Sequence, residues 1–130
     1  MTFDDIYRFF ESPPPIYLNK ELAVCYTLAT LLQADSYGTA LIQHLGGVRP
    51  DLRLSDTVLY SALKFLEEEG AIAGYWQKVE GRGRPRRMYH LCPETQLQAR
   101  QLADLWERYL MQPVSQPLLT PRRQAWVSSS

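Results

Sequence analysis

Apolar residues in the first 70 positions recur at intervals of three and four, the spacing that lines one side of an α-helix. This pattern predicts four helices, over residues 3–11, 19–34, about 36–46 and 55–69. Asn19 and Ser55 stand where an N-cap oxygen is needed, and we expect Asp35-Ser36 to cap the third helix. Gly46-Gly47 should end that helix, and Gly70 should end the fourth.

The segment before position 19 predicts a separate extension. Phe3, Ile6, Phe9 and Phe10 fall on one side of the helix over 3–11. Pro13-Pro14-Pro15 then stops that helix and forms a stiff connector. Residues 1–18 are therefore interpreted as an N-terminal helical extension with a Pro-rich connector.

The helix over 55–69 has two distinct faces. Its core face is predicted to hold Leu59, Ala62, Leu63 and Leu66. The opposite face has the same spacing and carries polar groups, one aromatic ring and a single charge, from Thr57, Tyr60, Ser61 and Lys64. Tyr60 could instead be half-buried core, but its place opposite the leucines favours exposure.

The pattern changes after Gly70 from helical spacing to strand-forming residues. Ile72, Tyr75, Trp76 and Val79 precede residues 80–87, and strand formers resume at Met88 to Leu91. Two glycines and a proline make 80–87 a turn or loop tip. The result is a β-hairpin expected to carry four arginines at its tip: Arg82, Arg84, Arg86 and Arg87.

A last helix is predicted after Cys92, with Pro93 near its first position. Its apolar stripe comprises Leu102, Leu105, Trp106 and Tyr109, and Pro113 should end it. We interpret residues 19–92 as one folded domain, 93–112 as a dimerisation helix and 113–130 as a flexible tail. The fold class is mainly α with a small β-hairpin (α+β), a winged helix-turn-helix with extra N- and C-terminal helices.

Charge is unevenly distributed in this neutral chain. The 130 residues carry 14 basic and 14 acidic side chains, yet residues 71–92 hold five bases and one acid, or +4. A local basic patch in a neutral protein suggests a placed anion-binding element.

Other classes of protein find little support. No stretch approaches a membrane span, no basic region precedes an apolar one at the start, and Cys25 and Cys92 suit a reducing cytosol. We expect a cytoplasmic, nucleoid-associated protein. Phosphate loops, zinc motifs and nucleophile elbows are missing, so no enzyme activity, cofactor, metal or catalytic residue is expected.

Three helices followed by a basic hairpin describe a winged helix-turn-helix, which places one helix in a major groove of double-stranded DNA and a wing beside it. Residues 19–92 are therefore interpreted as a DNA-binding domain. Thr57, Tyr60, Ser61 and Lys64 can reach bases or phosphates from the helix. The arginines can reach the backbone or a minor groove, because a guanidinium binds phosphate bidentately.

Three motifs, in order, resemble PadR-type regulators. Thr57–Gly70 resembles their recognition helix, Gly83–Leu91 their wing, and Tyr37–Ile42 the start of their second helix. The likeness spans about 22–93, and the aromatic extension and the single C-terminal helix depart from it. It implies a transcription factor, usually a repressor, that dimerises through terminal helices. Tyr60 and Lys64 would contact DNA from the helix, with Arg84 and Arg86 contacting it from the wing.

Several alternatives stay open. The arginines could form only a solvated loop, although their density favours DNA contact. Ser55 is more plausibly a cap than a base reader. Asp56 repels phosphate, and it could face away, cap the helix or accept from a cytosine amino group.

The terminal helices suggest a homodimer. We expect Trp76 and the three helices over 19–34, about 36–46 and 55–69 to supply the core, so that the last helix needs a partner. The expected interface comprises Phe3, Ile6, Phe10, Leu102, Leu105, Trp106 and Tyr109. Rival functions are a protein-interaction adaptor, or a repressor gated by an unknown small aromatic effector in a pocket at the dimer interface near Trp76, Trp106, Tyr26 or Tyr109.

Overall fold

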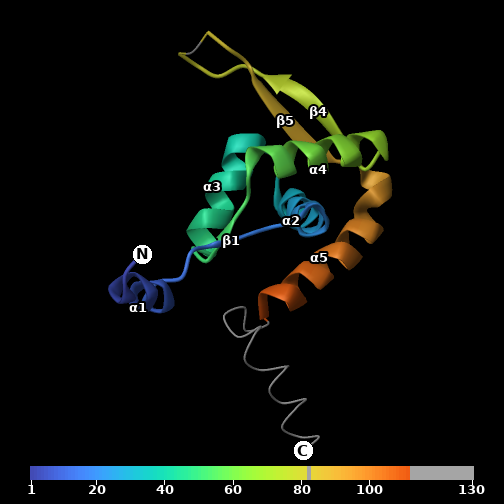
Figure 1. Ribbon diagram of the computed structural model, residues 1–130. Coiled ribbons are helices and arrows are strands. Elements are labelled where there is room, and N and C mark those ends of the chain that lie inside the picture. The colour runs from blue at the N-terminus through green and yellow to red at the C-terminus, as the bar shows by residue number, and fades with distance from the viewer. Residues whose placement is uncertain (82, 112–130) are drawn as a thin grey trace, which may run out of the picture.

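A computed structural model of the protein describes residues 1–81 and 83–111 and confirms a mainly helical chain with one β-hairpin (Figure 1). Residue 112, the helix end expected at Pro113 and the tail 113–130 lie outside this part of the chain. The elements in order are α1 (Phe3–Glu11), β1 (Ile16–Tyr17), α2 (Lys20–Gln33), β2 (Ser36–Tyr37), α3 (Gly38–Val48), β3 (Leu52–Arg53), α4 (Asp56–Glu68), β4 (Ile72–Gln77), β5 (Arg86–Leu91), a 3-10 turn (Pro93–Thr95) and α5 (Gln96–Met111).

The predicted caps of the second and fourth helical segments are confirmed. The Leu22 amide donates to Asn19 Oδ1 at 2.8 Å, and the Val58 amide donates to Ser55 Oγ at 3.2 Å. These oxygens satisfy amides that have no partner inside the helix. At the other end of α4, Gly70 has φ 75°, the left-handed conformation expected after a helix.

The start of α3 differs from the prediction. The N-cap residue is Tyr37 rather than Asp35 or Ser36, and no side chain caps the helix. Ser36 and Tyr37 instead form β2, antiparallel to β5 and paired with Tyr89 and Met88. Pairing with the hairpin gives these backbone groups partners that a cap would not supply. The helix then runs on past Gly46-Gly47 to Val48, because packing of the fully buried Leu45 outweighs the low helix propensity of glycine.

A second difference is a two-residue parallel pair between β1 and β3, which joins Ile16 to Leu52. Segments this short have no readable period, so only their approach in the folded chain reveals the pairing.

The core lies where α2 packs against α4 and α5. All four residues predicted for the inner face of α4 are buried: Leu59, Ala62, Leu63 and Leu66. Trp106 of α5 is only 4% exposed, and its ring centroid lies 5.4 Å from that of Tyr26. Trp76, by contrast, is 64% exposed and does not contribute to the core.

The burial of Trp106 and the exposure of Trp76 correct the expectation that α5 has no packing partner within its own protomer. Trp106 is buried inside its own protomer, so it is not free to form a dimer interface as expected. Leu102 and Tyr109 are half-buried against the same core, and only Leu105 of the predicted stripe is exposed. The core extends to Ala99 and Trp106 of α5, whereas strand β4 carries Trp76 out along the hairpin.

Helix α1 forms as predicted, and none of its residues is buried. Thr2 and Asp5 make a reciprocal capping box at its start. Figure 1 shows α1 set apart from the other helices, at the far end of the segment that leads through β1 to α2. Its apolar side chains, including Phe3, Ile6 and Phe10, therefore remain exposed within one protomer.

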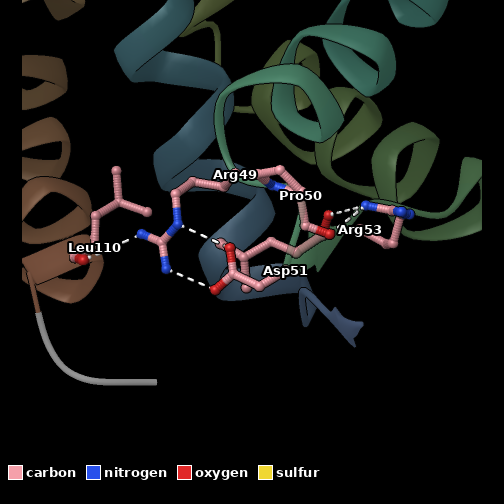
Figure 2. A network of polar contacts seen from close by, with 6 residues as sticks. Arg49, Pro50, Asp51, Arg53 and Leu110 are labelled. Carbon is pink, nitrogen blue, oxygen red and sulfur yellow. Dashed lines mark hydrogen bonds and ion pairs between the residues drawn. The ribbon is translucent and has the colours of Figure 1, made fainter. Parts of the chain in front are cut away.

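Arg49 joins the end of α3 to the end of α5 (Figure 2). Its guanidinium donates to both carboxylate oxygens of Asp51, at 2.9 and 2.8 Å, and to the Leu110 carbonyl at 3.1 Å. A cation is favourable at this end of a helix, where the last carbonyls are unpaired. The same contact with Arg49 lowers the pKa of the Asp51 carboxyl.

Replacing Arg49 with Gln should remove this link and cost about 1 kcal/mol of unfolding free energy, because the groups are partly exposed. The matching fall in Tm is about 4 °C, measured by thermal unfolding. Arg53→Gln serves as control, since the acceptors of Arg53 among the described residues are the nearby Pro50 and Leu52 carbonyls. Equal Tm values for the two variants would contradict a role for the Arg49 contact in holding α5.

Burial raises the pKa of Tyr26 to about 12, and its hydroxyl donates to the Leu41 carbonyl at 2.6 Å. Between pH 10 and 12 the folded chain keeps this proton while the unfolded chain releases it, so stability falls as pH rises. A shift of two pKa units corresponds to about 3 kcal/mol.

Tyr26→Phe should therefore lose less stability than the wild type over this pH range. At neutral pH the variant should be about 1 kcal/mol less stable, because the Leu41 carbonyl loses its donor. Urea unfolding at pH 7, 10 and 12 measures both effects, with the exposed Tyr7→Phe as control. If the unfolding free energy of Tyr26→Phe falls with pH as steeply as that of the wild type, the raised pKa of Tyr26 is contradicted.

Candidate nucleic-acid interface

The outer face of α4 is exposed, as its spacing predicted. Thr57, Tyr60, Ser61 and Lys64 are all exposed, with Tyr60 at 50%. Ser55 caps the helix, so Asp56 is not the N-cap and instead occupies the exposed first turn. An acid is favourable there because the amino end of a helix is positive.

Gly38 provides the space that Tyr60 occupies. A Cβ atom built on Gly38 would collide with the hydroxyl and ring of Tyr60. The glycine at the start of α3 therefore lets the Tyr60 ring lie across that helix end while half of its surface stays exposed. Periodicity along α4 indicates where Tyr60 faces, but it does not reveal this contact with a residue 22 positions away.

The arginines predicted at the hairpin tip occupy different environments. Arg84 is exposed near the turn, and Arg82 lies outside the described residues. Arg86 and Arg87 are not at the tip; both belong to β5 and are half-buried. The ladder extends farther than the sequence suggested because Gln77 and Trp76 pair with these two arginines.

Arg86 and Arg87 both contact the protein. The guanidinium of Arg86 lies 3.9 Å from the ring centroid of Tyr37 in β2. This geometry gives a cation–π attraction that ties the hairpin to β2.

Arg87 faces the other side of the hairpin, where it meets α4. Its Nη2 lies 3.3 Å from Glu67 Oε2, and its guanidinium carbon lies 5.1 Å from the ring centroid of Trp76. The neighbouring Tyr89 is buried, which raises its pKa, and the Glu67 carboxylate raises that pKa further. Spacing along α4 gives no sign of this contact between Glu67 and a residue 20 positions away.

The base of the hairpin is held from a third direction. The Tyr75 hydroxyl donates to Asp35 Oδ2 at 2.6 Å, and this hydrogen bond raises the pKa of Tyr75. The Tyr75 ring also packs on His90, with centroids 5.9 Å apart. Contacts with β2, with α4 and with Asp35 between α2 and β2 therefore hold the strands, while Figure 1 shows the tip projecting beyond the body.

A groove of about 460 Å³ lies between α2, α3 and α5, on a different part of the molecule. Tyr26 and Trp106 line it together with polar groups that include Asp35, His44 and Glu107. Trp76 does not line it, so the aromatic residues proposed for an effector pocket do not all meet there. Among residues 1–81 and 83–111, no three His, Cys, Asp or Glu side chains gather as a metal site.

Within the part of the chain described, no helix combines the length and the apolar character needed to cross a bilayer.

An exposed polar helix face beside a projecting basic hairpin defines a winged-helix protein.

The family comparison agrees with this class. The family model of the transcriptional regulator PadR-like family matches residues 27–101. The chain belongs to this family and is a DNA-binding transcriptional regulator rather than an enzyme. A comparison with curated proteins found no match.

Solved structures include close relatives. The circadian clock associated protein Pex from Anabaena is 63% identical, with TM-score 0.78, over 85% of this chain and 96% of that chain. Pex from Synechococcus is 67% identical, with TM-score 0.83, over 86% of this chain and all of that chain (100%). A transcriptional regulator from Clostridium thermocellum is 26% identical, with TM-score 0.56, over 75% of this chain and 92% of that chain.

Proposed function

We propose that this regulator is a homodimeric repressor that inserts α4 into the major groove and lays the β4–β5 wing along the neighbouring backbone or minor groove. The observation that carries the proposal is the exposed outer face of α4, which lies beside a hairpin with basic residues. The operator would be roughly palindromic, with half-sites one or two turns apart, a turn being about 34 Å.

The proposed contacts divide by chemistry. Tyr60, Thr57 and Ser61 offer hydroxyls to base edges and phosphates, and Lys64 adds a cation one helical turn further on. Arg84, near the wing tip, is assigned to the backbone or minor groove, and Arg82 is assigned there from its place in the sequence alone. Arg86, which stacks on Tyr37 and is half-buried, is assigned to the backbone beside the wing stem.

Dimerisation is proposed through the surfaces of the terminal helices that one protomer leaves exposed. None of the described residues buries the apolar side of α1, and Leu105 of α5 is 50% exposed. Leu102 and Tyr109 would border that contact. Burial of such apolar side chains in a two-fold interface would favour association.

The relatives suggest a biological setting. The Anabaena relative is described as circadian clock associated. We infer that this chain regulates a gene linked to the circadian clock. Identification of bound sites across the genome tests this setting, and sites unrelated to clock genes would contradict it.

Arg84→Ala should make DNA binding less sensitive to salt. Loss of one phosphate contact makes the negative slope of log K against log salt concentration shallower by about 0.9. Fluorescence anisotropy would be measured on duplexes selected from a random library by the wild-type chain. Arg100→Ala, an exposed change on α5, is the matched control.

Equal slopes for Arg84→Ala and wild type would remove the wing tip from the interface. Failure of the wild-type chain to select any duplex would instead favour the protein-interaction adaptor, with the exposed aromatic face of α1 as its working surface.

Leu105→Asp should shift the protein from dimer to monomer, because it places a charge in an apolar contact. Light scattering during size-exclusion chromatography over a range of concentrations measures the mass. Gln96→Asp is the control, since it adds the same charge to α5 about 2.5 turns earlier, on the opposite side. A dimer that withstands Leu105→Asp would place the interface elsewhere.

A further inference from the structure

Arg87 occupies a slot in the protein rather than open solvent. A Cβ atom on Gly74 of β4 would collide with the Arg87 guanidinium, so this glycine makes the space in which the side chain lies. The ring of Trp76 is on one side, and the ring centroid of Tyr89 is 5.8 Å from the guanidinium carbon. The Arg87 and Glu67 side chains are only 37% and 35% exposed.

The contact between these two side chains joins two parts of the proposed interface. Glu67 lies in the last turn of α4, and Arg87 lies on β5, the second strand of the wing. The chain links α4 to the wing only at the other end of β4, through Gly70 and Ala71. The ion pair with the aromatic packing therefore restrains how the wing leans relative to α4.

We propose that Glu67 is a positioning residue for DNA recognition, which sets the angle between wing and recognition helix by holding Arg87. This inference rests on the proposed function, because it concerns the same interface. It assigns Arg87 to positioning the wing rather than to contacting phosphate. It also means that Glu67 favours the binding of DNA, although both are negatively charged.

The sign of the effect separates this idea from simple electrostatics. If Glu67 acted only through its charge, Glu67→Gln would tighten DNA binding by removing repulsion. If it holds the wing, Glu67→Gln should weaken binding to the selected duplex by roughly threefold to fivefold, the size that a partly exposed ion pair supplies. Glu68→Gln removes the same charge from the next, exposed position and should not weaken binding.

Arg87→Gln and the double variant Glu67→Gln/Arg87→Gln complete a double-mutant cycle. If Arg87 acts through Glu67, the double variant should bind about as weakly as either single variant. The salt slope of Arg87→Gln should stay at the wild-type value, whereas loss of a phosphate contact would lower it by about 0.9. A merely structural defect would lower Tm without this combination of non-additive affinity and unchanged slope.

Hydrogen exchange of the β4–β5 amides gives a readout that needs no DNA. Exchange should quicken in Glu67→Gln and stay at the wild-type rate in Glu68→Gln. Unchanged exchange in Glu67→Gln, or affinity equal to or above that of the wild type, overturns the inference. If the wild-type chain binds no DNA, the proposed function fails as a whole, and exchange alone then decides whether Glu67 holds the wing.

Discussion

The fit of the inner face of α4 against α2 sets the geometry of the whole interface. Leu59 and Leu63 are almost fully buried one turn apart, and close-packed interiors tolerate little rotation of such a pair. Once this face is fixed, the 3.6-residue period forces Tyr60 and Lys64 outward. The same rotation brings Glu67 to the flank of α4 that meets the hairpin, so one packing contact sets both the DNA-facing surface and the attachment of the wing.

Local patterns were enough to predict the helices and the outer face of α4. Asn19, Ser55 and Gly70 mark helix ends through bonds within a few residues of each cap, so their roles can be read from neighbouring sequence. The inner and outer faces of α4 follow from spacing alone, and for that reason the class of fold was also within reach.

Long-range contacts decided what the sequence could not show. Ser36 resembles a cap in its local setting, but β5 approaches from 50 positions away and makes it a strand residue. Trp76 and Trp106 have the same side chain, yet α5 brings Trp106 against Tyr26 while the hairpin carries Trp76 into solvent. The slot at Gly74 appears only when β4 and β5 are paired.

The wing arginines are consequently not equivalent, although they are neighbours in sequence. A guanidinium that already stacks on a ring or pairs with a carboxylate gives up those contacts if it turns to a phosphate. The exposed Arg84 makes no ion pair or ring contact with residues 1–81 or 83–111, so it has no such contact to give up there. Counting all the arginines between 82 and 87 therefore overstates the charge available to DNA. The net charge of zero is compatible with a nucleic-acid partner because only a few well-placed cations need to face the duplex.

Helix α5 connects this interface to the proposed dimer. Trp106 fixes one side of α5 in the core, and Arg49 holds its last turn to the loop that leads from α3 toward α4. A helix attached at both points cannot swing freely, so a dimer formed through its outer side would transmit its geometry to α4 with little loss. The distance between two recognition helices, and with it the spacing of operator half-sites, would then follow from the packing of α5 on α2 rather than from a flexible linker.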